Sequence, residues 1–313
     1  MRRALPALLA ALALSAGPTG CGGSRPAPPP RPPAATVQPG AALDLGTAPS
    51  PLAVRLGDPR DVVRHRFRHP PRAGLLFDLD TGQVLWRRNP TRKLRIASLT
   101  KMMTALVVDR RVPAGARVPI TKVALRYQGS AVGLLPRGKR IDVSTMLHGL
   151  LLPSGNDAAR ALAQRAAGGS IGRFVRLMNA RSSRMNLTCS RFSSPDGFQD
   201  RGNYSCAADL AAIGRAVLRS PRLAPIVGRA RAVLPFPIKG GKIYLANHNP
   251  LLRTGYRGAT GIKTGYTNAA GSCLVATARR GPVKLGVVLL DSPDIDRQAR
   301  ALLDRGFRFE LNR

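Results

Sequence analysis

The order of strand-like and helix-like segments is the feature that most limits how this chain can fold. Segments with the apolar pattern of strands lie at residues 75–86 and again at residues 261–290. Between them, apolar residues recur at the three- and four-residue spacing of helices. Strands at both ends with helices between them predict an α+β fold, in which one antiparallel sheet carries an inserted helical region.

The strand-like segments predict where the folded domain begins. Residues 75–79 and 83–86 flank the turn Asp80-Thr81-Gly82 and therefore predict a β-hairpin. We assign residues 73–313 to one folded domain that starts with this hairpin. The further elements that the pattern predicts are helices at residues 98–110, 143–152, 158–167, 171–184 and 207–219, strands at 261–265, 272–278 and 283–290, and a last helix at about 295–303.

Residues 1–21 have the features of an export signal. Arg2 and Arg3 precede an apolar run at residues 4–16, which is too short to span a bilayer. Thr19-Gly20-Cys21 resembles the cleavage and lipidation site of bacterial lipoproteins, although Pro18 stands where that site normally has an aliphatic residue. Two alternatives stay open: a lipid anchor at Cys21, or a secreted protein cut near Ala16.

Residues 22–72 differ in composition from the rest of the chain. They are rich in Pro, Ala and Gly up to about residue 51, and strongly basic from residue 55 onward. The Pro-rich composition is typical of an extended, semi-rigid spacer. His65 and His69 lie in the basic part without further clustered ligands, so we interpret residues 22–72 as a solvated tether and not as a metal site.

The net charge of +34 points to polyanionic partners. Outside a bacterial cell these are anionic wall polymers and the lipid headgroups of the membrane surface. Nucleic acid is the usual alternative, but the sequence shows no nucleic-acid-binding motif, and the export signal argues against it. We therefore expect the protein in the cell wall or at the outer face of the cytoplasmic membrane. Coding bias toward arginine is an alternative source of part of the charge.

Four cysteines constrain the redox chemistry. With Cys21 assigned to the lipid site, Cys189 and Cys206 bracket a polar loop and form the expected disulfide in an oxidising compartment. Cys273 lies in an apolar run and is expected to be a buried thiol. No Cys-x-x-Cys pair occurs, so zinc is not indicated, and we expect neither a metal nor a cofactor.

Ser98 and Lys101 are the first pair of residues that indicates chemistry. If Ser98 opens a helix, Lys101 lies one turn later on the same face and brings its amine beside the serine hydroxyl. A lysine accepts the serine proton only in its neutral form, which burial or a second cation favours. Taken alone, the pair is weak, because a capping serine followed by a surface lysine is common.

Two downstream segments turn this pair into a signature. Ser154-Gly155-Asn156 follows an apolar helix, and Lys263-Thr264-Gly265 lies on a predicted strand. The combination of Ser-x-x-Lys, Ser-x-Asn and Lys-Thr-Gly in this order is the signature of penicillin-binding proteins and class A β-lactamases.

The signature chemistry gives each side chain a role. Ser154 can relay protons between nucleophile and leaving group, and Asn156 can orient Lys101 and the substrate amide. Lys263 supplies a positive field that keeps Lys101 neutral and attracts a substrate carboxylate.

The predicted strand that carries Lys263 also contributes its backbone. Gly265 lets a substrate backbone lie against the strand edge. The N–H groups of Ser98 and Tyr266 can form an oxyanion hole.

From about residue 73 to residue 309 the chain resembles the serine-type D-Ala-D-Ala carboxypeptidases, the low-molecular-mass penicillin-binding proteins. The resemblance implies their penicillin-binding/β-lactamase-like fold: a five-stranded antiparallel sheet flanked by helices, with an inserted all-helical lobe and the site between the two. Beyond the three signatures it includes residues 78–82, 194–197, 203–210, 247–252 and 261–267.

The resemblance also implies function. Ser98 would be the nucleophile, Lys101 the proton acceptor and Ser154 the third catalytic residue. The terminal D-Ala of peptidoglycan stem peptides would be removed through a serine acyl-enzyme, and β-lactam antibiotics would act as inhibitors. The residues implied in substrate binding are Asn156, Lys263, Thr264, Gly265 and Tyr266.

Three alternatives to this function differ in the residues that they require. A DD-endopeptidase that cleaves crosslinks would use the same site. A class A β-lactamase needs a glutamate between the second and third signatures, whereas the only glutamate of this chain is Glu310, and Gly155 stands where that class has Asp. A non-catalytic wall-binding protein would have no need for the complete set of signature residues.

Overall fold

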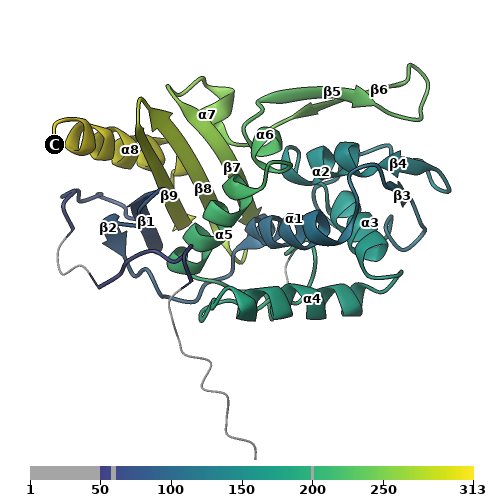
Figure 1. The fold of residues 1–313 in the computed structure, drawn as a ribbon, viewed down its shortest axis with the longest axis horizontal. Helices are drawn as coiled ribbons and strands as arrows, with labels where there is room; N and C mark the ends of the chain where they lie inside the picture. The colour runs from purple at the N-terminus through teal and green to yellow at the C-terminus, as the bar shows by residue number, and fades with distance from the viewer. Residues whose placement is uncertain (1–49, 58–60, 199–200) are drawn as a thin grey trace, which may run out of the picture. The chain divides into compact units, whose positions relative to one another are not determined.

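The computed structural model describes residues 50–57, 61–198 and 201–313 (Figure 1). The predicted export signal, Cys21 and most of the predicted tether lie outside these residues. Within the described ranges, no helix is both long and apolar enough to cross a bilayer. The elements in chain order are β1 (Ala73–Asp78), β2 (Val84–Arg88), the 3-10 helix η1 (Ala97–Leu99), α1 (Thr100–Arg111), β3 (Arg117–Pro119), β4 (Arg140–Asp142), α2 (Val143–Leu151), α3 (Asn156–Ala166), α4 (Ile171–Arg184), α5 (Ala207–Arg219), α6 (Ala224–Val227), β5 (Arg231–Pro235), β6 (Lys242–Ala246), α7 (Pro250–Arg253), β7 (Ala259–Thr267), β8 (Gly271–Arg280), β9 (Val283–Ser292) and α8 (Ile295–Leu311).

Five antiparallel strands form the central sheet, in the order β2-β1-β9-β8-β7. Strand β1 pairs with β2 on one side and with β9, from the other end of the chain, on the other. The structure thus confirms the α+β fold, the five-stranded antiparallel sheet and the hairpin predicted at residues 75–86. Strand β7 is the last strand of the sheet, so one of its edges is turned away from β8.

Helices cover both faces of this sheet (Figure 1). Leu75 and Phe77 of β1 belong to the larger core that also contains the apolar residues of α1 and α5, whereas Leu76 belongs to a second core formed with α8. The alternation follows from the two-residue period of a strand. Helix α8 therefore lies on the opposite face of the sheet from α5.

Helix α1 is the centre of the inserted helical region, which includes α2, α3 and α4 (Figure 1). Every residue from Thr100 to Val108 is buried, as expected for a helix that is surrounded by others. The small hairpins β3–β4 and β5–β6 were not predicted. In β5 and β6 the buried face is supplied mainly by Ala232, Ile243 and Leu245, too few apolar residues to give a clear strand pattern.

The chain before β1 already packs on the sheet, although its composition predicted a solvated tether. Val54 and Val63 are buried. The backbone N–H of Arg55 donates to Gly82, and that of Val63 donates to Leu85. Isolated valines among basic residues form no periodic pattern, which explains why the sequence did not indicate these contacts.

Helix α8 is longer than predicted. It continues beyond residue 303 to Leu311, because Phe307 remains buried against the sheet.

Candidate active site

Ser98 lies in the turn η1, directly before α1. The turn is held by a hydrogen bond that the Thr100 hydroxyl donates to the Ala97 carbonyl at 2.8 Å. Lys101 is in the first turn of α1, and its Nζ is hydrogen-bonded to Ser98 Oγ at 2.8 Å. The structure therefore brings the predicted nucleophile and its predicted proton acceptor into direct contact.

The Lys101 amine is completely buried. It also donates to Asn156 Oδ1 at 2.6 Å and to the main-chain oxygen of Asp196 at 2.8 Å. Burial disfavours the charged form of a lysine amine, so this position suits a group that must accept a proton from Ser98.

Asn156 and Ser154 come from the connection between α2 and α3. Asn156 begins α3, and its Nδ2 donates to the main-chain oxygen of Gln128. Ser154 is in the left-handed region, with φ of 66°. Its Oγ is buried and has no hydrogen-bond partner among the described residues, so this hydroxyl is available to exchange protons with a bound substrate.

Lys263 is carried by β7 and is also buried. Its Nζ donates to the Thr264 carbonyl at 2.8 Å. Burial first, and the charge of Lys101 second, hold the pKa of Lys263 well below its usual value. The two lysine amines of the signature are therefore close enough to repel each other when both are charged.

Gly265 lets β7 pass close to the nucleophile. A Cβ at this position would lie 2.9 Å from Ser98 N and 3.0 Å from Ile96 O, so a larger residue would push the strand away from η1. The neighbouring Thr264 is half-buried. Tyr266 is 65% exposed, and its hydroxyl donates to Asn268.

Three neighbours of the site were not predicted. Asp196 and Gln128 contribute main-chain oxygens, which leave no signal in residue type. His248 donates from its backbone to the Leu152 carbonyl, and burial, followed by the charges of Lys263 and Arg253, lowers its pKa. The segment 247–252 was part of the family resemblance, but nothing in the sequence placed His248 near Lys263.

A cavity of about 430 Å³ lies next to these main-chain groups. Its lining consists of Arg126, Tyr127, Gln128, Arg160, Ser194, Asp196 and Phe198.

The cysteines are arranged as the sequence predicted. Cys189 and Cys206 form a disulfide, and Cys273 is a buried free thiol. Asp209 lies near the disulfide, and its Oδ2 accepts from the Cys189 backbone at 2.8 Å. Because both sulfurs are bonded to each other, this group offers no thiolate to a metal ion.

Known proteins share both the sequence pattern and the fold. The family model described as D-alanyl-D-alanine carboxypeptidase matches residues 64–294. A D-alanyl-D-alanine carboxypeptidase of Bacillus subtilis is 32% identical over 85% of this chain and 68% of its own length. A D-alanyl-D-alanine endopeptidase of Pseudomonas aeruginosa is 34% identical over 71% of this chain and 76% of its own length.

A solved structure shares this fold. The crystal structure of the Streptomyces K15 DD-transpeptidase is 30% identical, with a TM-score of 0.73, and covers 78% of this chain and 100% of its own. The family match extends over well more than half of the chain and includes Ser98, Ser154 and Lys263. This chain therefore belongs to the D-alanyl-D-alanine carboxypeptidase family.

Proposed function

We propose that Ser98 is the nucleophile of this D-alanyl-D-alanine carboxypeptidase, and that it removes the terminal D-Ala of peptidoglycan stem peptides. The observation that carries the proposal is the contact of 2.8 Å between Ser98 Oγ and the buried Lys101 amine. A serine without a base is a weak nucleophile at neutral pH, and an adjacent neutral amine activates it.

Acylation begins when Ser98 Oγ attacks the carbonyl carbon of the penultimate D-Ala. The hydroxyl proton passes to the neutral Lys101 amine, and the carbonyl oxygen becomes an oxyanion. When the peptide bond breaks, the leaving amine of the terminal D-Ala takes up a proton that the Ser154 hydroxyl relays from Lys101. Backbone N–H groups of Ser98 and Tyr266 stabilise the oxyanion.

Deacylation reverses these roles. A water molecule donates a proton to Lys101 as its oxygen attacks the ester carbon, and Ser98 Oγ recovers a proton when the ester bond breaks. The products are the shortened stem peptide and the free enzyme.

Lys263 binds the carboxylate at the end of the substrate. In the empty site its pKa is lowered by burial and by Lys101. A carboxylate beside it favours the charged form, because an opposite charge stabilises an ammonium group. Substrate binding thus places a cation beside Lys101 and keeps the Lys101 amine in the neutral form that accepts a proton.

Endopeptidase cleavage of crosslinks is the second candidate function. The same nucleophile and base serve both reactions, and the Pseudomonas aeruginosa relative is named an endopeptidase. A β-lactamase is disfavoured, because Glu310 is the only glutamate of the chain and lies near the end of α8. β-Lactams are therefore expected to acylate Ser98 and to be released slowly.

The place of action that we propose is the outside of the cell. The support is the apolar run at residues 4–16 and the net charge of +34, which attracts anionic wall polymers and the membrane surface. A lipid at Cys21 would hold the enzyme at the outer face of the membrane.

The decisive experiment compares the wild type with Ser98→Ala. Mass spectrometry after penicillin treatment should show one adduct, on the peptide that contains Ser98, and only in the wild type. Incubation with a pentapeptide ending in D-Ala-D-Ala, and separately with a crosslinked dimer, shows which bond is cleaved. Adducts or D-Ala release by Ser98→Ala would overturn the assignment.

A further inference from the structure

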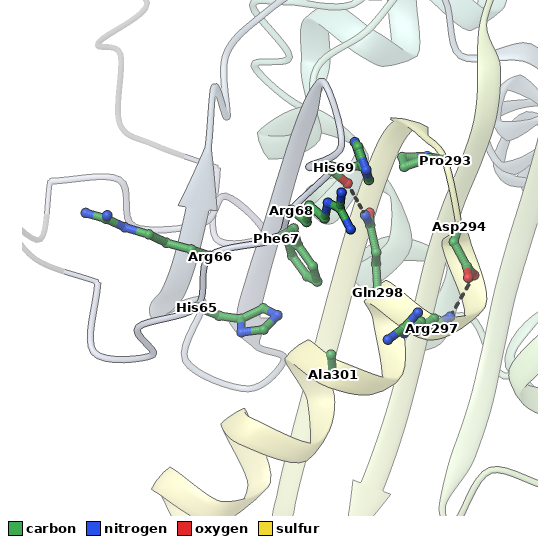
Figure 2. A pocket seen from close by; sticks show the side chains of 10 residues that line it. All are labelled: His65, Arg66, Phe67, Arg68, His69, Pro293, Asp294, Arg297, Gln298 and Ala301. Carbon is green, nitrogen blue, oxygen red and sulfur yellow. Dashed lines mark hydrogen bonds between the residues drawn. The ribbon is translucent and has the colours of Figure 1, made fainter.

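A second cavity lies on the face of the sheet that α8 covers, where the chain before β1 crosses the start of that helix (Figure 2). Its volume is about 620 Å³. Ala97 and Leu99, the neighbours of Ser98, pack in the core on the opposite face of the sheet together with α5. The cavity is thus a separate site, with no part in the catalytic steps above. Its lining residues are His65, Arg66, Phe67, Arg68, His69, Pro293, Asp294, Arg297, Gln298 and Ala301.

The segment that forms one wall is tied in place. Trp86 Nε1 donates to the His65 carbonyl at 3.2 Å, and Gln298 Nε2 donates to the His69 carbonyl at 2.6 Å. The Phe67 ring packs edge-on against His65 and Trp86, with ring centroids 4.2 Å and 5.9 Å apart. Residues 65–69 are therefore held at both ends, so the cavity does not depend on a loosely attached tail.

Two arginines from different elements border this cavity. Arg68 comes from the segment before β1 and Arg297 from the first turns of α8, and Figure 2 shows their side chains between these two elements. The Arg66 side chain, in contrast, extends away from α8. The site thus combines two guanidinium groups with an apolar wall made by Phe67 and Ala301.

These two guanidinium groups have no acidic partner among the described residues, whereas other arginines around α8 do. Arg300 pairs with Asp296 at 2.8 Å, and Arg280 pairs with Asp304 at 2.8 Å. The one carboxylate in the lining, that of Asp294, accepts from the backbone of Arg297 and caps the helix.

The surroundings add to the positive field. The pKa of His65 is lowered first by burial and second by the positive charge of Arg305.

We propose that this cavity binds a phosphodiester group of the glycerol phosphate type. Guanidinium groups bind phosphate oxygens through paired N–H donors, and the apolar wall accommodates the carbon part of such a unit. Glycerol phosphate units occur both in soluble anionic polymers and in the headgroup of phosphatidylglycerol. The two sources share one chemistry, which the arms of the experiment distinguish.

The test uses Trp86, which is the only tryptophan of the chain and lies against the wall of the cavity. A soluble poly(glycerol phosphate) is titrated into the protein, with Trp86 fluorescence and calorimetry as readouts. Arg68→Gln/Arg297→Gln should raise Kd by about tenfold or more, since hydrogen bonds between charged groups are lost.

The matched control is Arg64→Gln/Arg308→Gln. Both residues are exposed, come from the same two elements and lie outside the lining, so the loss of charge is the same. Its Kd should stay within about twofold of the wild type, since exposed distant charges are largely screened. Unchanged penicillin acylation of Ser98 in both variants shows that each is folded.

Three results would overturn the proposal. If both double variants weaken polymer binding equally, the overall charge of the protein, and not the cavity, accounts for binding. Polyglutamate that binds as tightly as the polymer, with the same dependence on Arg68 and Arg297, would remove the preference for phosphate. Binding without a change in Trp86 fluorescence would place the polymer elsewhere.

Vesicles of phosphatidylglycerol in phosphatidylcholine form the second arm, against phosphatidylcholine alone. A loss of vesicle binding in Arg68→Gln/Arg297→Gln, but not in the control, supports the lipid headgroup as a source. If Arg68→Gln/Arg297→Gln weakens binding to the polymer but not to the vesicles, and the control weakens neither, the soluble polymer is supported as the source.

Discussion

At the scale of single residues, the two buried lysines depend on each other. The charge of Lys101 is one of the two causes that lower the pKa of Lys263. The repulsion is mutual, so Lys263 in turn favours the neutral form of the Lys101 amine. The proposed base and the proposed carboxylate-binding residue are thus coupled through their electrostatic repulsion.

This coupling predicts the pH dependence of Lys263→Ala. Removing the second amine removes repulsion that disfavours a charged Lys101, so the rise in acylation rate with pH should move to higher pH. The measurement is the second-order rate constant for penicillin acylation across a pH series. Lys239→Ala, at an exposed lysine in the β5–β6 turn, is the control and should leave the profile in place. A variant that loses affinity with an unmoved profile would make Lys263 a binding residue alone.

Ser154 combines a proposed role in proton transfer with an unusual backbone conformation. Because its φ is 66°, glycine fits the conformation better than alanine does. Ser154→Ala and Ser154→Gly both remove the hydroxyl, and the acylation rate should fall by about 10²-fold or more in each.

The stability of the two Ser154 variants should differ although their activities do not. Ser154→Gly should be about 1 kcal/mol more stable than Ser154→Ala in urea unfolding. Wild-type acylation rates in either variant would remove Ser154 from the proton relay.

At the scale of elements, the disulfide ties the chain that follows α4 to the start of α5. Cys206 is the residue before α5, and Cys189 follows α4. Asp209 in the first turn of α5 also accepts from the Ser190 hydroxyl at 2.7 Å. The connection between the helices is therefore fixed by a covalent bond and by hydrogen bonds to one carboxylate.

Removing this disulfide should destabilise the fold without abolishing the site. Cys189→Ser/Cys206→Ser should lower the free energy of unfolding by about 3 kcal/mol, because the unfolded chain gains freedom. Urea unfolding measures this loss, and non-reducing peptide mapping of the wild type checks the pairing. A free thiol at Cys189 in the exported protein would contradict the prediction.

Cys273 serves as the internal control for thiol reactivity. Burial raises its pKa to about 12, so at pH 8 the folded protein should leave this thiol unmodified by an alkylating reagent. In the unfolded chain it should react readily.

At the scale of the whole molecule, the charge of +34 predicts binding to the cell wall that is independent of catalysis. Attraction to anionic polymers should weaken strongly as salt rises, since the Debye length falls to about 3 Å near 1 M. The rate of turnover of a small soluble peptide should fall far less with rising salt than wall binding does, because the reacting groups lie together in a buried site.

Sedimentation of Ser98→Ala with wall sacculi across a salt series measures this attraction. Sacculi stripped of their anionic polymers are the control. Binding that is insensitive to salt, or unchanged by stripping, would show that the charge does not localise the enzyme.

The apolar patterns of the sequence predicted the sheet and most of the helices, and its signatures singled out Ser98, Lys101 and Asn156, which the structure joins by hydrogen bonds. Strands β8 and β9 are buried on both faces, so their apolar runs stand out without knowledge of their neighbours. Ser98 and Lys101 are one helical turn apart, so local geometry alone brings them together.

The remaining contacts of the site depend on the tertiary structure. The oxygens of Asp196 and Gln128 that accept from Lys101 and Asn156 belong to the backbone, which is the same for every residue type. The cavity beside α8 likewise depends on a basic segment that folds back onto the helix. Such contacts between segments far apart in the chain leave no periodic pattern in the sequence, because each one depends on where the rest of the fold places its partner.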